Sequence, residues 1–341
     1  MAVTNSIDIS TLYARLNQMG LSKNFVRENG LPEWWTEECE TLPDATLTAA
    51  AYISRRFNLE FQSLITPESQ PTFQQSTKTC YKKVDHHVLP EISIASHLGR
   101  RVAELVVKTY TKEYQPIAGR TAYQIREEIL NLGKVVNLEN LLNFCAEYGI
   151  PVFHFARFPK TVKKFHGMVT DFTSKPVVVI GLQDLSPSRL AFILAHELGH
   201  IALNHLEAGE TINDEEIKLD DVQNDNECAA NEFAIELLLG KSDQVYYFPQ
   251  YMKAESLAFS AREKAKRDQN DPGAIAWNYG WYKKSHFAVA RKAVNLIEKN
   301  ENAPKMINQQ LSQLLDWDCL SEDNQEYLAL ALKLDRNQVG G

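Results

Sequence analysis

The sequence lacks several features that would assign it to common classes of protein. Its five cysteines are odd in number, stand far apart and form no CxxC pair, so neither a disulfide framework nor a cysteine-based zinc site is expected. No apolar run is long enough to span a bilayer, and the first residues show no basic-then-apolar signal sequence. We therefore expect a cytoplasmic protein with reduced thiols and no membrane partner.

Excess basic charge is also missing. The formal net charge is −8 at pH 7, which disfavours a protein that mainly binds nucleic acid, because binding to duplex DNA depends on Lys and Arg that neutralise phosphates. The sequence contains no internal repeat, no phosphate-binding glycine loop and no Ser-His-Asp arrangement. With 341 residues, of which 44% are hydrophobic, the chain is long enough for two or three domains.

One motif that is present, His196-Glu197-Leu198-Gly199-His200, carries the clearest chemical signal. On a helix, residues i and i+4 lie on one face, so the two histidines can bind one metal ion. Glu197 then stands where the general base of a metallohydrolase must lie. An apolar strand at 177–180, a turn and a Ser186-Pro187 helix start come before the motif, and this context favours an active-site helix over a core helix with two satisfied histidines.

A third metal ligand is expected downstream, because catalytic zinc takes three protein ligands and leaves one position to water. The segment Asn226–Ala234 predicts a second helix whose small residues permit close packing on the first. We expect Glu227 to bind the metal and Asn231, on the same face at i+4, to hydrogen-bond a ligand histidine. The alternative is that Glu227 is one more acid of the solvated loop before it, with Asp225 and Asp221 as other possible ligands.

Together these residues resemble the ImmA/IrrE family of zinc metallopeptidases. The resemblance rests on the apolar strand, the Leu190–His200 segment, an acidic loop and the segment Glu227–Leu239, and it extends over residues 90 to 295. It implies a thermolysin-like (gluzincin-like) HExxH enzyme reduced to a compact domain. Several members of the family cleave helix-turn-helix repressors and so release stress-response or mobile-element genes, so the resemblance implies a protein substrate of that kind.

We predict a mainly helical α+β fold, in which a small sheet lies beside the HExxH helix of a compact zincin-like domain. Residues 1–66 are expected to form a small all-α, helix-turn-helix-like domain, residues 67–90 a linker, residues 91–250 the zinc metallopeptidase domain and residues 251–341 a helical region packed on it. Residues 1–70 contain five basic and nine acidic side chains. For this unit we therefore favour a protein-interaction role over direct operator binding.

The predicted reaction is zinc-dependent hydrolysis of peptide bonds. Glu197 would take a proton from water and return it to the departing amine, while His196, His200 and Glu227 hold the ion. The choice between zinc and manganese stays open, because such ligand sets are not strictly selective. The donor to the oxyanion is open as well. His166 is the first candidate, followed by Tyr246, Tyr247 and His205.

Two other classes of protein compete with an enzyme. One is a transcriptional regulator that keeps the peptidase fold but binds DNA or a partner through residues 1–70. Loss of Glu197 or of a ligand, and a basic first domain, would mark that class, and the sequence shows neither. The other is an antitoxin-like interaction protein whose metal is structural, which predicts a closed site with four protein ligands and no position for water. The cleaved substrate, the activating signal and the oligomeric state do not follow from the sequence.

Overall fold

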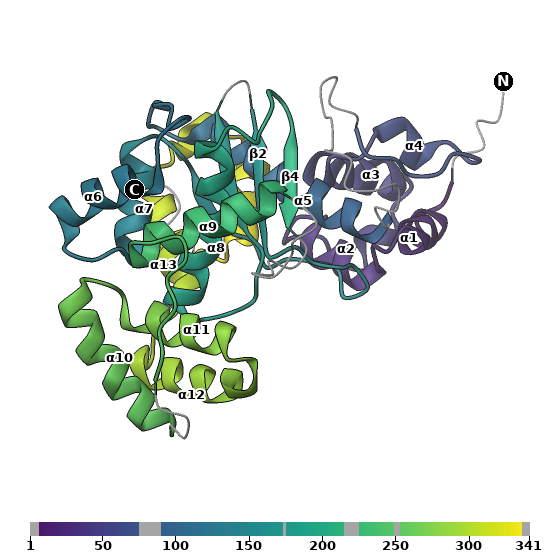
Figure 1. The fold of residues 1–341 in the computed structure, drawn as a ribbon. Coiled ribbons are helices and arrows are strands. Elements are labelled where there is room, and N and C mark those ends of the chain that lie inside the picture. Colours follow the sequence, from purple (N-terminus) through teal and green to yellow (C-terminus); the bar gives the residue numbers. More distant parts are fainter. Residues whose placement is uncertain (1–6, 75–89, 173–174, 215–224, 249–252, 336–341) are drawn as a thin grey trace.

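The computed structural model describes residues 7–74, 90–172, 175–214, 225–248 and 253–335. Most of these residues are helical, and four short strands form one mixed sheet near the middle of the molecule (Figure 1). The predicted class, a mainly helical α+β fold, is confirmed. Among the described helices, none has both the length and the apolar character that crossing a bilayer requires.

The first two described helices are short and capped by side chains. Asp8 accepts a hydrogen bond from the Thr11 backbone N–H at 2.7 Å, and Ser22 caps the second helix in the same way. The elements are α1 (Ile9–Gln18), α2 (Lys23–Asn29), the 3-10 turn η1 (Cys39–Thr41), α3 (Ala45–Phe57) and α4 (Phe61–Ile65).

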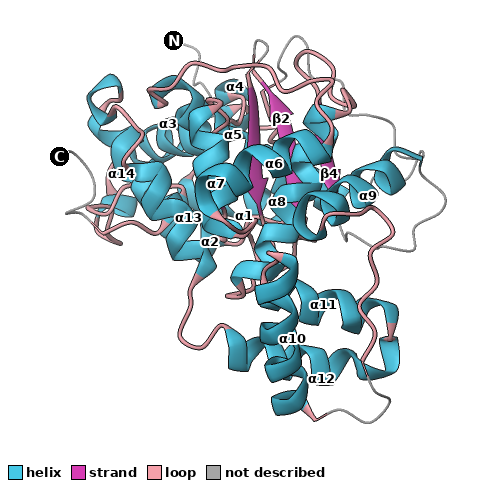
Figure 2. Ribbon diagram, turned by 60° about the vertical axis from the view of Figure 1, so that its left-hand side comes forward, coloured by secondary structure: helices cyan, strands magenta, loops and turns pink. Residues whose placement is uncertain are grey.

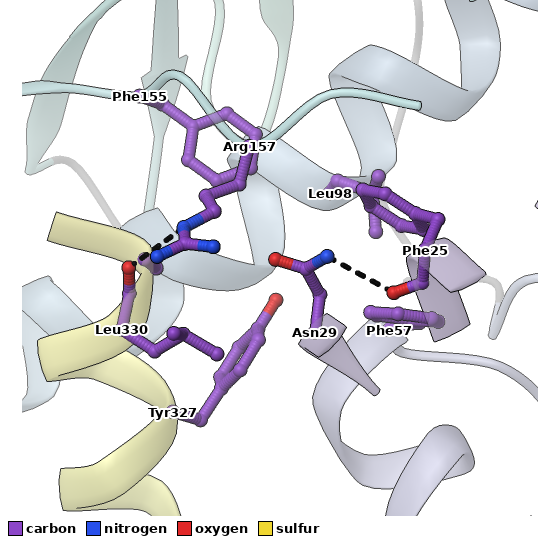
Figure 3. Close-up of a pocket in the computed structure, with 9 residues that line it drawn as sticks. Phe25, Asn29, Phe57, Leu98, Phe155, Arg157, Tyr327 and Leu330 are labelled. Carbon is purple, nitrogen blue, oxygen red and sulfur yellow. Dashed lines mark hydrogen bonds between the residues drawn. The ribbon is translucent and has the colours of Figure 1, made fainter. Parts of the chain in front are cut away.

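These N-terminal helices share one hydrophobic cluster with α5 (Pro90–Thr109) and the last helix, α14 (Glu322–Leu332). The guanidinium of Arg56 in α3 is fully buried and pairs with Asp323 and Glu326 of α14 at 2.7 and 2.9 Å. A small pocket at this junction is lined by side chains from α2, α3, α5 and α14 (Figure 3). Within it, Asn29 donates to the Phe25 carbonyl and Arg157 donates to the Leu330 carbonyl, so the pocket belongs to the packing of the two ends of the chain.

The sheet has the strand order β1-β3-β2-β4. Strand β1 pairs with β3 in parallel, whereas β2 pairs with both β3 and β4 in antiparallel fashion. The predicted strand at 177–180 is confirmed. One strand, β4, was not predicted. It lies within the acidic segment 207–227, which we expected to be a solvated connection. That expectation was wrong for the residues of the strand. The bounds are β1 (Val152–His154), β2 (Gly167–Asp171), β3 (Pro176–Ile180) and β4 (Thr211–Asp214).

Side chains alternate between the two faces of this sheet, as strand geometry requires. One face packs in a cluster with helix α8 (Pro187–Ala202) and includes Val169, Val178 and Ile212. The opposite face packs with α5 and includes Met168 and Val179. The sheet is therefore covered on both faces. The helix that covers the first of these faces, α8, contains the HExxH motif.

Helix α8 begins as the sequence predicts. The Ser186 hydroxyl accepts from the Arg189 backbone N–H at 3.3 Å, and Pro187 occupies the first turn. A Cβ atom at Gly199 would lie 3.2 Å from the Ala230 Cα. The glycine therefore lets the helix that contains Ala230 pack closely on α8. The other helices of this part are α6 (Ala122–Gly133), α7 (Leu138–Glu147) and α9 (Asp225–Leu239).

The C-terminal helices divide into a projecting lobe and a returning segment. Helices α10, α11 and α12 form a lobe that projects from the body at the bottom of both views (Figures 1 and 2), and α10, α11 and α12 share a small buried cluster of their own. Helix α13 returns to the sheet, where Asn308 hydrogen-bonds both the backbone N–H and the carbonyl of His154. The bounds are α10 (Ala254–Asp268), α11 (Pro272–Tyr282), η2 (Lys284–His286), α12 (Phe287–Ile297), α13 (Ala303–Ser312) and η3 (Trp317–Cys319).

The buried ring of His154 makes stability depend on pH. It is 3% exposed, its Nε2 lies 2.9 Å from the Leu182 carbonyl oxygen, and burial lowers its pKa to about 4. Because the unfolded chain binds a proton at this residue below about pH 6.5 and the folded chain does not, stability falls as pH drops from 6.5 to 4. We expect this residue to account for a loss of about 3 kcal/mol in the free energy of unfolding over that window.

Urea unfolding of wild type and His154→Gln at pH 7.5 and pH 4.5 measures this dependence. The glutamine variant should be less sensitive to pH than the wild type, even if it is less stable at both values. Equal pH sensitivity of the two proteins would contradict the assignment.

Candidate metal centre

Four side chains converge between α8, α9 and the end of β4. They are His196, His200, Asp214 and Glu227, and their ligand atoms all lie within 4.8 Å of one another. The Nε2 atoms of the two histidines are 3.1 Å apart. The carboxylate oxygens of Glu227 lie 3.2 Å from Nε2 of His196 and 3.6 Å from Nε2 of His200. Two imidazoles and two carboxylates at this spacing form a donor set that suits a divalent cation.

Each histidine of this cluster is oriented through its other ring nitrogen. Nδ1 of His196 lies 3.0 Å from Oδ1 of Asn231, and Nδ1 of His200 lies 3.0 Å from Nδ1 of His205. With both Nε2 atoms directed into the cluster, Nδ1–H is the donor in each pair. Asn204 has φ +59° after the end of α8, and this turn brings His205 back beside His200. His205 was predicted only as a possible oxyanion donor, and its contact with His200 was not predicted.

Glu197 lies next to the cluster in a fully buried position. Neither of its carboxylate oxygens has a hydrogen-bond partner among the described residues. A Cβ atom added at Gly167, the first residue of β2, would overlap the Glu197 carboxylate. The glycine therefore leaves the space that this side chain occupies. A buried carboxylate without partners is unfavourable unless the site serves a purpose other than stability, because burial of an unpaired charge costs several kcal/mol.

The charges of the site shift the pKa values of its members. Burial raises the pKa of Glu197 well above its usual value, and the carboxylates of Asp214 and Glu227 raise it further. Burial opposes protonation of His196, but hydrogen bonds and charge from the same two carboxylates outweigh it and raise the pKa of His196 to about 9. For Glu227, burial is outweighed by His196 and His200, so its pKa falls far below the usual range. The site thus concentrates negative charge that a cation would offset.

Gly167 gives a direct test of how Glu197 is positioned. In Gly167→Ala the new methyl group would displace the Glu197 carboxylate, while the four clustered side chains stay in place. We expect the rate of peptide hydrolysis to fall about 100-fold, because displacements near 1 Å have effects of that size. Kinetic assays of the variant measure the fall, and its metal content and melting temperature should stay close to the wild-type values. A variant with wild-type activity would show that Glu197 does not need this space.

Other predicted residues lie outside the cluster. His166 precedes β2, and its backbone N–H donates to the Asp214 carbonyl at 2.7 Å, but its ring is not one of the four clustered groups. The Tyr246 hydroxyl donates to Asp268 and accepts from Asn270, which also donates to the carbonyl of Leu239 at the end of α9. Tyr247 is 82% exposed. Asp225 is exposed at the start of α9, and Asp221 lies outside the described residues.

Asp214 is the clustered residue that sequence reasoning missed. It was one of eight acids in the segment that precedes Glu227, and nothing in their spacing distinguishes it. Its place follows from the pairing of β4 with β2, in which Asp214 lies opposite Gly167. Residues opposite each other in a ladder present their side chains on the same face. The Asp214 carboxylate therefore lies on the face of the sheet that α8 covers, and Glu197 belongs to that helix.

A buried HExxH helix, a second helix that supplies a carboxylate, and a small sheet beside them form the arrangement expected of a metallopeptidase domain. Residues 145–269 match the family model described as Peptidase_M78, the IrrE N-terminal-like domain. Residues 145–269 thus match the ImmA/IrrE-type peptidase family, and the resemblance noted in the sequence is confirmed over this segment. The match covers less than half of the chain and contains all four clustered residues. No curated protein and no solved structure gives a significant match.

Proposed function

We propose that this protein is a zinc-dependent metalloendopeptidase that cleaves a helix-turn-helix transcriptional repressor. The observation that carries the proposal is the buried Glu197 carboxylate beside the four-residue cluster, with no hydrogen-bond partner among the described side chains. A metal site that only stabilised the fold would gain nothing from this group. A general base needs to be close to the reacting water and free to accept its proton.

The proposed roles follow from the placement of each side chain. His196, His200 and Glu227 would hold the ion, and Asn231 and His205 would fix the two imidazole rings through Nδ1. When bound, a divalent cation would supply Lewis acidity that activates water and polarises a carbonyl group. Glu197 would accept the proton from that water and deliver it to the amine that leaves. The space left by Gly167 keeps the Glu197 carboxylate in its position.

An extended peptide fits the edge of the sheet in this proposal. Strand β4 is the last strand in the order β1-β3-β2-β4, and it ends at the metal cluster. A substrate that added itself to such an edge would gain main-chain hydrogen bonds and place one of its peptide bonds near Glu197. The choice of a repressor as substrate rests on the family resemblance. The N-terminal helices, whose segment carries more acidic than basic side chains, are proposed to bind this partner.

The test uses the full chain purified with its metal. Bound metal is quantified, and the chain is then incubated with each repressor-like protein encoded near its own gene, with mass spectrometry to locate any cut. We expect one of these proteins to be cleaved at a single peptide bond by the zinc-loaded chain and to stay intact with metal-stripped chain. If zinc-loaded chain leaves these proteins and a mixed peptide library intact, the proposal is wrong.

A second candidate function is an interaction protein with a structural metal. It is favoured by one observation, the presence of Asp214 as a fourth potential ligand in the cluster, because structural zinc sites are closed by four protein ligands. That function gives no reason for the buried Glu197 or for the gap at Gly167. We therefore favour the enzyme, and the position of Asp214 needs its own explanation.

A further inference from the structure

Several spacings within the cluster are close to those of ligand atoms around one zinc ion. Bonds of about 2.0 to 2.2 Å to zinc place neighbouring ligand atoms about 3.3 to 3.6 Å apart. Oδ2 of Asp214 lies 3.3 Å from Nε2 of His196 and 3.7 Å from Nε2 of His200. Glu227 approaches the same two nitrogens with different oxygens, Oε2 at 3.2 Å from His196 and Oε1 at 3.6 Å from His200. By distance, Asp214 fits the ligand set as well as Glu227 does.

The surroundings of the Asp214 carboxylate also favour binding to a cation. The residue is 7% exposed, and the groups that lie against its Oδ2 atom are the imidazoles of His196 and His200. An ionised carboxylate in this position is unfavourable unless a positive charge compensates it. The two imidazoles alone provide that charge only while they are protonated, whereas a divalent cation between them provides it permanently.

The backbone holds Asp214 in this orientation. Its carbonyl accepts from the His166 backbone N–H at 2.7 Å, and its Cα pairs with that of Gly167. Two residues earlier on the same face, Ile212 is buried in the cluster that contains α8. Because side chains alternate along a strand, the burial of Ile212 directs Asp214 toward α8 as well. The carboxylate is therefore presented to the metal site by a paired strand.

We propose that Asp214 is a fourth protein ligand of the bound cation and that it occupies the coordination position needed by the water that attacks the peptide bond. In this conformation the enzyme is latent, and hydrolysis requires Asp214 to leave the ion. This inference rests on the proposed function for its consequence, but the ligand assignment stands on the geometry of the four side chains. It also reconciles a closed set of four ligands with a buried general base, since Glu197 is already in place for the moment when Asp214 withdraws.

The first test measures metal binding without any substrate. Competition with a chromophoric chelator gives the zinc affinity of the full chain, of Asp214→Ala and of the isosteric Asp214→Asn. We expect both variants to bind zinc about tenfold or more weakly, since even the loss of groups that only support a ligand has effects of this size. The control is Asn213→Ala, which changes the preceding residue of β4 and should keep the wild-type affinity. Wild-type affinity in both Asp214 variants would overturn the ligand assignment.

The second test measures access to the ion. The cobalt-substituted chain is titrated with acetohydroxamate, which binds an open metal position and changes the visible absorption of cobalt. We expect Asp214→Ala to respond at a concentration about tenfold or more lower than wild type, in line with a ligand removed from one corner of the site. Equal responses of the two proteins would show that the position is already open, and the proposal of latency would be wrong.

Hydrolysis of a peptide library separates this inference from the proposed function. If the protein is a latent peptidase, Asp214→Ala at saturating zinc should cleave at least as fast as wild type. Loss of cleavage with zinc retained would instead assign Asp214 a direct part in the reaction and overturn latency. Absence of cleavage by every variant counts against the proposed function, while the zinc and cobalt measurements still decide whether Asp214 is a ligand.

Discussion

Glu197→Gln is expected to abolish peptide hydrolysis while metal binding is kept. The amide is nearly the same size as the carboxylate and fits the same space beside Gly167, but it cannot accept a proton from water. General acid–base catalysis contributes roughly 100-fold to 10,000-fold to a rate, and we expect a loss near the upper end of this range. Steady-state assays on a cleaved peptide measure the loss.

Two controls make the result specific to the general base. Glu127→Gln removes the same charge from an exposed position on α6 and should leave the rate unchanged. Zinc content, measured on the same preparation of Glu197→Gln, should match the wild-type value. A Glu197→Gln protein that holds zinc and hydrolyses peptides at the wild-type rate would refute the assigned role.

Glu227→Gln is expected to weaken zinc binding by about 100-fold or more, because it removes an anionic ligand rather than a supporting group. The same change should lower the melting temperature of the zinc-loaded protein, since an ion that binds the folded chain stabilises it by mass action. Chelator competition gives the affinity, and calorimetry with and without zinc gives the shift in melting temperature.

The matched control for this variant lies on the same helix. Glu232→Gln changes an exposed carboxylate of α9, five residues further along, and should preserve both zinc affinity and melting temperature. If Glu227→Gln behaves like this control, the ion is held without Glu227, and Asp214 becomes the principal carboxylate of the site.

Much of the fold follows from local sequence signals. The start of α8 is encoded by Ser186 and Pro187, and β3 is encoded by a run of β-branched residues, so both were predictable without knowledge of their partners. Strand β4 was not, because Thr211–Asp214 contains one apolar residue and becomes a strand by pairing with β2. Helices α1, α5 and α14 share one hydrophobic cluster. Sequence periodicity shows which face of each helix is apolar, but not which helices pack together.

The site divides in the same way. Spacing within a helix brings His196 and His200 to one face, and the small residues of α9 indicate where a second helix packs against α8. The contribution of Asp214 depends on a strand register, and that of His205 depends on a left-handed turn at Asn204. Neither feature leaves a pattern in the local sequence.

The joining of the two ends of the chain has a practical consequence for mapping the partner. Helices α1 to α3 bury Leu12, Leu16 and Ile53 in a cluster that α14 helps to complete, and Arg56 is neutralised by acids of α14. A recombinant fragment truncated near residue 70 would expose these apolar side chains to water and would be prone to aggregate or to capture proteins nonspecifically. Pull-down experiments aimed at the N-terminal helices should therefore use surface point variants of the intact polypeptide.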